Sequence, residues 1–316
     1  MSRRSRHSKG KKIWLIIFSI VAIVALIVLG ISAKLYFDLS GSIKETYESV
    51  ERQQQSEKNR RTAPVDLNKQ EPFSVLLLGI DTGDQGRTEQ GRSDTMMVAT
   101  VNPKNNKTTL VSIPRDTYVD IIGHGTKDKI NHAYAFGGAA MSMDSVENYL
   151  DIPIDHYVSI NMMGIKELVD AFGGVDVNND IEFNVGETHY GFGQIHLNGE
   201  EALGYLRMRY DDPRGDYGRQ QRQRSVVEAV VKKALTLDGV SQYQGILNAL
   251  EGNMKTDLSF DDMQQIALDY RGSFKSIEQL QMQGSEFWIG DISYQKVSDE
   301  ELQSVQKTLQ QQLNIK

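Results

Sequence analysis

The feature that most constrains the fold is an uncharged, almost entirely apolar run of 21 residues from Ile13 to Ala33. As a helix rising about 1.5 Å per residue it would be about 32 Å long, which matches the roughly 30 Å hydrocarbon core of a bilayer. A cleaved signal peptide is the alternative, because small residues lie between Gly30 and Ala33. Its apolar region, however, normally runs only about 7–15 residues. We therefore expect a transmembrane helix at residues 13–33 that is retained as an anchor.

The charge distribution predicts how this anchor is oriented. The first twelve residues carry six basic groups and no acidic one, and the formal net charge of the chain is −7, so the remaining residues carry −13 (−7 − 6). Since a basic flank stays in the cytoplasm, we expect a single-pass type II protein of the cell membrane, with residues 1–12 inside and the body outside. A body this acidic is a poor general binder of nucleic acid, so no nucleic-acid partner is expected. The absence of cysteine excludes disulfides and thiolate metal sites.

The rest of the chain divides into two predicted parts. Residues 34–72 are rich in Gln, Glu, Lys and Arg, which is typical of a polar extracytoplasmic stalk that acts as a spacer. Residues 73–316 alternate between strand-like and helix-like patterns, which predicts a single α/β domain, a three-layer α-β-α sandwich. Residues 279–316 give no clear signal. Methionines such as Met162 are interpreted as core residues, with a lipid groove as the alternative.

Three strand-like segments open the predicted domain. Residues 73–80 form a continuous apolar run, which is typical of a strand buried on both faces, and 95–101 and 108–113 follow. The turn at Pro103 is too short for a parallel crossover, so the central sheet should be mixed.

Charged residues collect where these strands end. Asp81 follows the first segment, Asp94 precedes the second and Arg115 follows the third. If the first two strands are antiparallel neighbours, the two carboxylates lie at one edge of the sheet, and Arg115 joins them if the third strand runs alongside the first. Two carboxylates without nearby His or Cys suit a hard cation, Mg²⁺ or Mn²⁺. The alternative is that these aspartates only form turns and helix caps.

An arginine cluster lies downstream, between residues 207 and 224. It contains no lysine, and a guanidinium grips two phosphate oxygens at once where an ammonium is a point charge. The cluster consists of Arg207, Arg209, Arg214, Arg219, Arg222 and Arg224, interleaved with Asp211, Asp212 and Asp216. A salt-bridged, solvated helix face is the alternative to an oxyanion site.

A helix is predicted to begin near Asp216, which can cap it and direct its backbone N–H groups toward an anion. Arg219 lies on one face of this helix with either Arg222 or Gln223. Further along, an apolar stripe is expected to seat the helix on the sheet: Val226, Val227, Val230 and Val231.

Six segments together resemble the LytR-CpsA-Psr family of extracytoplasmic cell-wall transferases. They match in order and spacing: FSVLLLGID (73–81), GRSDTMMVATVNP (91–103), VSIPRDTYV (111–119), KINHAYAFGG (129–138), HLNGEEALGYLRMR (196–209) and DPRGDYGRQQRQR (212–224). The resemblance implies an α-β-α fold with a hydrophobic pocket for an isoprenoid tail.

The resemblance also implies residue roles. Asp81 and Asp94 would hold the metal ion, and a larger set would bind a pyrophosphate: Arg92, Arg115, Arg207, Arg209, Arg219, Gln220, Arg222 and, in a matching motif, Gln223. Those expected to act in catalysis are Asp81, Asp94, Arg115, Arg209, Asp216 and Arg219. The general base stays open between Asp216 and a carboxylate near the metal.

The implied reaction moves an anionic glycopolymer, wall teichoic acid, from a polyprenyl-pyrophosphate carrier to the muramic-acid 6-hydroxyl of peptidoglycan, releasing polyprenyl phosphate. The expected partners are therefore the polyprenyl-linked glycopolymer, peptidoglycan and lipid of the cytoplasmic membrane. Phosphoryl transfer depends on positioning and on cations near the phosphates, which agrees with the residues above. Three alternatives stay open: a hydrolase of the same lipid, a non-catalytic polymer binder, and a membrane-bound regulator of cell-wall genes.

Overall fold

The computed structural model describes residues 41, 46–52, 61, 63–81, 91–236 and 243–315. The chain divides into two compact units, Met1–Ser42 and Ile43–Lys316, and the second contains nearly all the described residues. The predicted tail (1–12) and transmembrane helix (13–33) lie outside the described residues. Among the helices that are described, none combines the length and the apolar character needed to cross a bilayer.

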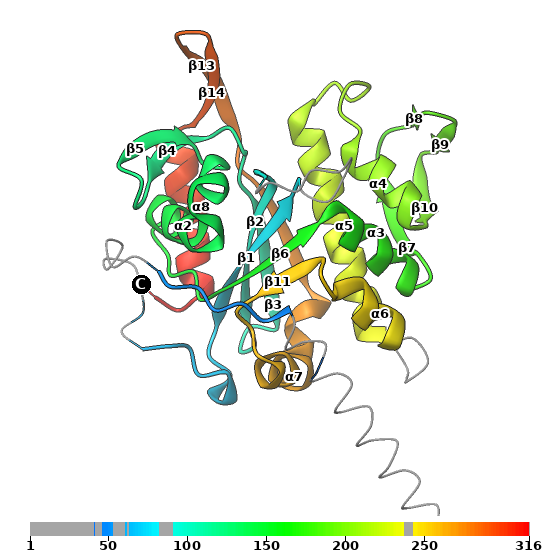
Figure 1. Cartoon of the computed structure of the whole chain (residues 1–316), viewed down its shortest axis with the longest axis horizontal. Coiled ribbons are helices and arrows are strands. Elements are labelled where there is room, and N and C mark those ends of the chain that lie inside the picture. The colour runs from blue at the N-terminus through cyan, green and yellow to red at the C-terminus, as the bar shows by residue number, and fades with distance from the viewer. Residues whose placement is uncertain are drawn as a thin grey trace, which may run out of the picture. The chain divides into compact units, whose positions relative to one another are not determined.

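The second unit is built on a six-stranded mixed sheet with the order β11-β6-β1-β2-β3-β12 (Figure 1). Four further pairs, β4-β5, β7-β10, β8-β9 and β13-β14, form small two-stranded sheets. The strands are β1 (Phe73–Ile80), β2 (Ser93–Asn102), β3 (Lys107–Ser112), β4 (Tyr118–Ile121), β5 (Thr126–Lys129), β6 (His156–Asn161), β7 (Val175–Asn179), β8 (Phe183–Val185), β9 (Thr188–Tyr190), β10 (Gly193–Leu197), β11 (Met254–Thr256), β12 (Ile277–Gln281), β13 (Gly284–Ile289) and β14 (Ile292–Val297).

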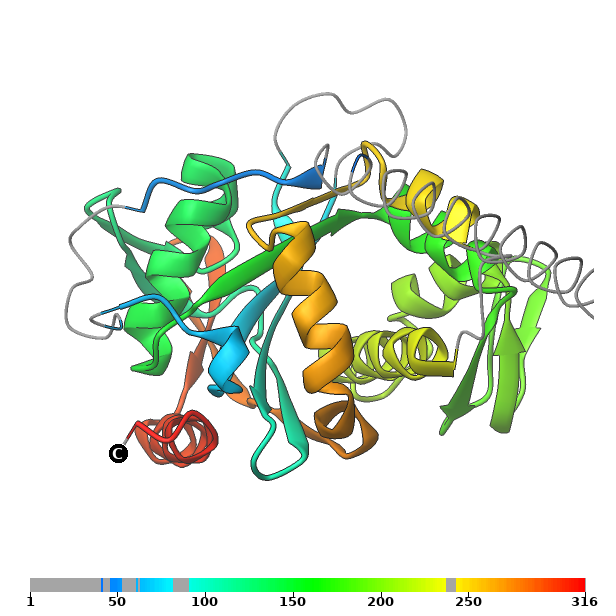
Figure 2. The ribbon, with the colours of Figure 1, turned by 90° about the horizontal axis from the view of Figure 1, so that it is seen from below.

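Helices cover both faces of the sheet (Figures 1 and 2), with α2 and α8 on one side and α3 and α5 on the other. They are α2 (His132–Leu150), α3 (Met162–Ala171), α4 (Gly199–Arg207), α5 (Asp216–Thr236), α6 (Tyr243–Leu250), α7 (Phe260–Asp269) and α8 (Asp299–Gln312), with 3-10 turns η2 (Leu67–Lys69) and η3 (Arg271–Lys275). The predicted α/β class and mixed sheet are confirmed.

Connection lengths explain the mixed strand directions. The short turn after Pro103 makes β2 and β3 antiparallel, and β1 is antiparallel to β2. The parallel pair β1 and β6 needs a long crossover, which α2 supplies. α2 itself bends at Gly137-Gly138, where Gly138 has a φ of 63°, a left-handed conformation that favours glycine.

One face of the sheet is tightly packed. Leu76 of β1 and Val98 of β2 are fully buried there, in a cluster that also contains Val146 of α2 and Leu309 of α8. This cluster is the largest of the three apolar clusters of the unit, so it carries much of the hydrophobic stabilisation.

The opposite face looks toward residues 162–236, which form a separate lobe of α3, α4, α5 and the small sheets β7-β10 and β8-β9 (Figure 1). The lobe has its own apolar cluster, which includes Val169, Phe183, Tyr190 and Tyr205. Because this lobe and the packed face keep distinct cores, the region between them is where cavities can form.

Two regions differ from the sequence-based expectations. Part of the predicted stalk belongs to the folded unit, since Arg52 forms ion pairs with the buried carboxylates of Asp144 (2.8 Å) and Glu147 (2.9 Å) in α2, and Arg61 pairs with Asp155 (2.6 Å). Residues 279–316, which gave no clear signal, form most of β12, the β13–β14 hairpin and α8.

Candidate active site

The candidate site lies at the sheet edge where β1 ends and β2 begins. Asp81 directly follows β1, Asp94 is the second residue of β2, and the two strands are antiparallel neighbours as predicted. β3 pairs with β2 instead of β1, but it runs in the direction of β1, so Arg115 still arrives at this edge. The Nη1 of Arg115 lies 2.8 Å from Oδ1 of Asp94. The predicted meeting of Asp94 and Arg115 is therefore confirmed.

Arg115 belongs to a chain of alternating charges. Its Nε lies 3.7 Å from Oδ2 of Asp116, and Oδ1 of Asp116 lies 2.8 Å from Nζ of Lys129. Burial alone would lower the pKa of Arg115, but the carboxylates of Asp94, Asp116 and Asp216 outweigh it and the pKa is raised. Arg115 thus carries a fixed positive charge at the sheet edge.

Helices α4 and α5 bring further cations to the same place. α4 begins with a capping box formed by Asn198 and Glu201 and ends at Arg207. α5 begins at Asp216, and its first turn approaches the preceding loop so closely that a Cβ on Gly218 would lie 1.9 Å from Oδ2 of Asp212. A Cβ has no room there, which explains the glycine at position 218.

Asp216 organises the first turn of α5. Its carboxylate accepts hydrogen bonds from the side chains of Arg219 and Gln220, the latter at 2.8 Å. Burial and the nearby guanidinium groups of Arg115 and Arg209 lower the pKa of Arg219 even though Asp216 raises it. The guanidinium groups of Arg115, Arg209 and Arg219 therefore lie close enough to repel one another, and a bound anion would relieve that repulsion.

Some of these groups line a polar cavity of about 270 Å³. Its walls are formed by Asp81, Asp94, Met162, Leu206, Arg207, Arg219 and Gln223. Two buried nitrogens at the site, Nε of Arg115 and Nε of Arg219, have no hydrogen-bond acceptor among the described residues. Buried donors of this kind call for an acceptor such as a phosphate oxygen.

The polar cavity adjoins an apolar one of about 260 Å³, and Met162, Leu206 and Gln223 line both. A second apolar cavity of about 190 Å³ extends it along the sheet and shares Leu77, Val158, Val227 and Val231 with the first. The valine stripe of α5, which was predicted to seat the helix on the sheet, instead borders these cavities. The lipid-groove alternative for Met162 is the better description of its position.

The arginine cluster divides into two groups. Arg207 and Arg219 line the polar cavity, and Arg209 is exposed and close enough to Arg219 to lower its pKa. Arg214 pairs with Asp180 (2.6 Å) and Asp212 (2.9 Å). The oxyanion interpretation fits the first group, and the salt-bridge interpretation fits Arg214.

Arg222 requires a correction. Its side chain is 1% exposed, and it donates to the carbonyls of Tyr205 and Met208 and to Oδ2 of Asp212, at 3.1, 2.6 and 2.6 Å. Since its three donor nitrogens are engaged within the protein, the expected role in pyrophosphate binding is wrong, and Arg222 instead joins α5 to the end of α4.

Other predicted residues take intermediate positions. Arg92 is exposed, and its carbonyl accepts a 3.2 Å hydrogen bond from the backbone of Asp81. Gln220 is buried beside Asp216, so it positions that carboxylate. Leu206, at the junction of the polar and apolar cavities, was not predicted, because nothing in its own sequence distinguishes it from an ordinary core leucine.

The carboxylates of Asp81 and Asp94 fit a hard divalent cation. They form an all-oxygen pair on the wall of one polar cavity. No cluster of three or more metal-ligating side chains occurs in the described part of the chain, so phosphate oxygens and water would have to complete the coordination, as is usual for Mg²⁺.

Fold and site together define a class: an α/β protein with an arginine- and carboxylate-lined head site that lies next to an apolar channel, suited to an amphiphilic phosphate. Comparison with known families gives a specific assignment. Residues 35–311 match the LytR_cpsA_psr family, and the chain belongs to that family.

Named relatives cover nearly the whole chain. The polyisoprenyl-teichoic acid–peptidoglycan teichoic acid transferase TagU of Enterococcus faecalis is 60% identical over 309 residues, covering 98% of this chain and 100% of that protein. The protein of the same name in Bacillus subtilis is 40% identical over 311 residues and covers 98% of this chain and 99% of the relative.

Solved structures share the fold. A crystal structure from Enterococcus faecalis, described as a transcriptional regulator, is 50% identical with a TM-score of 0.72, and the match covers 80% of this chain and 91% of the other. A structure of TagT bound to LI-WTA is 33% identical with a TM-score of 0.69, covering 84% of this chain and 100% of the other.

Proposed function

We propose that this chain is a glycopolymer phosphotransferase that moves teichoic acid from a polyprenyl-pyrophosphate carrier to peptidoglycan. The observation that carries the proposal is the junction of the polar cavity with the apolar cavity at Met162, Leu206 and Gln223. A diphosphate with an isoprenoid tail has the same two-part character. The relatives named as teichoic acid transferases support the same conclusion.

The arginines supply most of the chemistry. Arg207 and Arg219 would contact the diphosphate in the polar cavity, with Arg115 and Arg209 nearby, and their charges would stabilise the negative charge that builds up on the departing polyprenyl phosphate. An acceptor hydroxyl attacks the sugar-proximal phosphorus and the bond from that phosphorus to the bridging oxygen breaks. The hydroxyl proton goes to a carboxylate of the site.

Asp81 and Asp94 would hold Mg²⁺ or Mn²⁺, for the reasons of donor chemistry given above. When bound, the ion adds positive charge beside the phosphate oxygens. Asp94 has a second task in this proposal, because its ion pair with Arg115 holds that guanidinium next to the carboxylate. Asp216 positions Arg219, whose side chain lines the polar cavity, in the same way.

We also propose that residues 13–33 anchor the chain in the cytoplasmic membrane with the catalytic unit outside the cell. The support is the 21-residue apolar run and its basic N-terminal flank. An anchor keeps the site beside a membrane-borne donor, so it raises the local concentration of one substrate.

The test uses the full chain in detergent or vesicles with a lipid-linked donor and peptidoglycan oligomers. Wild type is expected to attach polymer only when acceptor and divalent cation are present, and Asp94→Ala and Arg219→Ala are expected to lose attachment while staying folded. Release of phosphorylated lipid without any need for acceptor would favour the hydrolase instead. Wild-type attachment by both variants would refute the proposed site.

A further inference from the structure

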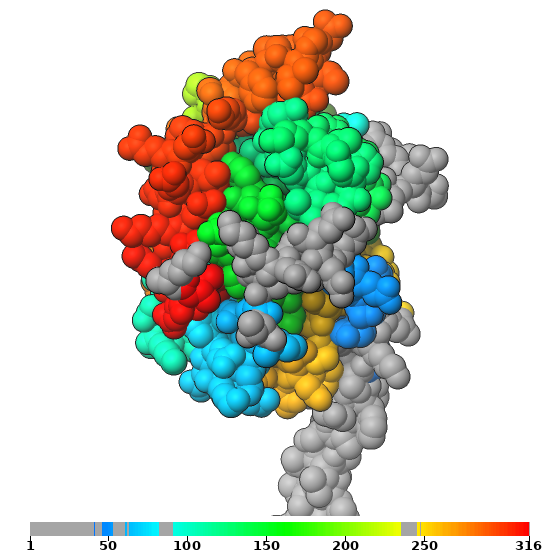
Figure 3. All heavy atoms as spheres, turned by 90° about the vertical axis from the view of Figure 1, so that its left-hand side faces the viewer, coloured from blue at the N-terminus to red at the C-terminus, as the bar shows by residue number. Residues whose placement is uncertain are grey.

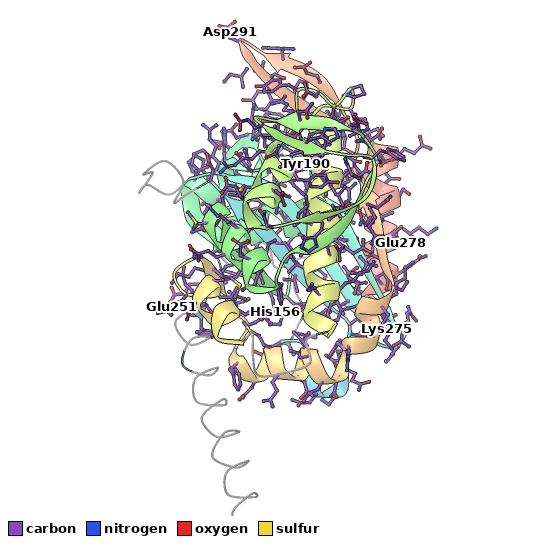
Figure 4. The ribbon with its side chains drawn as sticks, turned by 90° about the vertical axis from the view of Figure 1, so that its right-hand side faces the viewer. His156, Tyr190, Glu251, Lys275, Glu278 and Asp291 are labelled. Carbon is purple, nitrogen blue, oxygen red and sulfur yellow. The ribbon has the colours of Figure 1, made fainter. Side chains whose placement is uncertain are left out.

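The β13–β14 hairpin stands out from the body of the second unit beyond α2 and α8 (Figure 3). Its tip, marked by Asp291 in Figure 4, carries large exposed apolar side chains. Trp288 is 61% exposed, Ile289 46% and Ile292 52%. Aromatic and aliphatic groups gathered on a projecting element mark an interaction surface.

The base of this hairpin is fastened to the candidate active site. The hydroxyl of Tyr217 donates to the carbonyl of Gly284 and accepts from its N–H, both at 2.8 Å. On the second strand, the N–H of Gln295 donates to the carbonyl of Asp116 at 2.9 Å. Tyr217 is next to Asp216 in the sequence, and Asp116 is next to Arg115. The base of the hairpin is therefore hydrogen-bonded to residues at the edge of the site.

The pleat of the hairpin separates its side chains into two faces. Phe287 pairs with Tyr294, and both pack against Tyr118 of β4 with ring centroids 5.6 and 4.9 Å away. Ile289 and Ile292 pair with each other and have the same parity, so they extend this body-facing side.

Trp288 lies on the other face. It pairs with Ser293, and the same face carries Gly284, Glu286 and Gln295. Since the side chain of Gln295 lies 3.4 Å from the hydroxyl of Tyr217, this face begins at the N-terminus of α5 and continues outward. Trp288 is four positions beyond Gly284 on the strand, so the Cα atoms of these two residues lie about 13 Å apart.

We propose that this second face, Glu286, Trp288, Ser293 and Gln295, is a platform that binds the glycan strand of the acceptor. The inference rests on the proposed function, because it assumes that the acceptor is peptidoglycan. An exposed indole offers a flat apolar surface to the C–H face of a sugar ring, and neighbouring carboxylate, hydroxyl and amide groups can bind its hydroxyls. The hydrogen bond from Ser293 to Glu286, at 2.5 Å, holds two of these groups in place beside the indole.

A bilayer is the competing occupant of the hairpin tip, and two observations disfavour it. The isoleucines that would enter the hydrocarbon lie on the opposite face from Trp288. Between residues 284 and 297 there are two carboxylates, Glu286 and Asp291, and one cation, Lys296, so the hairpin has a net charge of −1 (1 − 2). A negative tip is repelled by an anionic membrane surface.

The experiment uses the full chain, which contains only two tryptophans, Trp14 and Trp288. In the Trp14→Phe variant, Trp288 is the only tryptophan, so tryptophan emission reports on this residue alone. Titration with lipid-free, phosphate-free oligomers of N-acetylglucosamine and N-acetylmuramic acid is expected to give a saturable change in its emission. By calorimetry, Trp288→Ala is expected to weaken oligomer binding by at least about tenfold and Trp288→Phe to retain most of it.

Two controls separate this inference from its rivals. The double variant Ile289→Ser, Ile292→Ser is expected to bind the oligomers like wild type. In the transfer assay Trp288→Ala should raise the acceptor KM and leave the donor KM unchanged. Because the binding titration contains no donor, a protein that binds glycan through Trp288 but transfers nothing contradicts only the proposed function. An emission shift with anionic vesicles and none with glycan overturns the platform.

Discussion

The two faces of the central sheet are built from alternating residues of the same strands, yet they serve different ends. Toward α2 and α8, side chains such as Leu76 and Val98 are completely buried in a continuous core. Toward the 162–236 lobe, Leu77 borders cavities of about 260 and 190 Å³, and Met97 borders the first of them. Protein interiors are normally packed without such voids. The side chains on the second face therefore make fewer van der Waals contacts than those on the first.

This difference shows how a small domain separates stability from binding. The packed face holds the sheet in place, so the strand ends that carry Asp81, Asp94 and Arg115 do not depend on the cavity being filled. The cavity face then remains free to accept an apolar chain whose burial would contribute to substrate affinity.

The largest expected effect tests this comparison on adjacent residues of β1. Leu76→Ala opens a void in the packed core and is expected to lower the free energy of unfolding by about 4 kcal/mol. Leu77→Ala enlarges a cavity that already exists, so about 1 kcal/mol is expected. Denaturant titration of the two variants measures both values.

Equal losses for Leu76→Ala and Leu77→Ala would mean that the two faces are packed alike. Circular dichroism of each variant before titration confirms that the sheet has formed, and the slope of the unfolding transition reports whether the same surface is exposed.

The packed face was largely predictable from the sequence, and the cavity face was not. The run Phe73–Ile80 is apolar at every position but Ser74 and Gly79, so it predicts a strand buried on both sides. Whether the atoms beyond a given side chain are a helix or a void depends on how α5 and the lobe are held. The sequence around Val227 would be the same whether this residue packed in a core or bordered a cavity. Its position on a cavity wall is therefore visible only in the structure.

The next comparison sets two arginines of α5 against each other. Arg222→Ala leaves Asp212 buried without one of its partners and is expected to cost about 3 kcal/mol of stability. Arg219→Ala removes a cation from the polar cavity and is expected to lower the rate of polymer transfer about 100-fold, with little change in stability. Thermal unfolding and the transfer assay together show whether each arginine acts in stability or in transfer.

A transfer defect for Arg222→Ala in a protein that unfolds like wild type would restore Arg222 to the site. Sequence alone could not separate these two residues, because both belong to one Arg-Gln-Gln-Arg stretch on α5. What separates them is the loop that places Asp212 under the helix beside Gly218, and that close approach is a tertiary feature.

Acid sensitivity is expected to reside on the lobe side of the molecule. Burial by itself would raise the pKa of Asp212, but hydrogen bonds from Arg214 and Arg222 lower it from 3.8 to about 2. A folded pKa below the unfolded value stabilises the native state above pH about 4, and this contribution, about 2 kcal/mol, is lost as the pH falls toward 2. Unfolding free energies of wild type and Asp212→Asn between pH 6 and 2 measure it.

The Asp212→Asn variant should lack this acid-dependent component, because its side chain no longer titrates. Asp180→Asn is the matched control, since Asp180 also pairs with Arg214 but is more exposed, and a change below about 1 kcal/mol is expected. If the two variants have the same pH profile, the buried pair does not carry the effect.

The smallest expected change in stability comes from adding volume to the cavity face, and the same addition to the packed face serves as the comparison. Val227 borders both apolar cavities, so Val227→Phe has room for the larger ring and should change the unfolding free energy by less than about 1 kcal/mol. Val146, fully buried on the packed face, has no such room, and Val146→Phe is expected to cost about 1–3 kcal/mol.

If the channel holds the isoprenoid tail, Val227→Phe should raise the donor KM about tenfold for a long-chain carrier and far less for a short-chain analogue. Val146→Phe should alter neither KM, because its cost falls on the fold. Equal KM changes for both chain lengths would place the tail elsewhere, since a ring added deep in the channel can obstruct only a chain long enough to reach it.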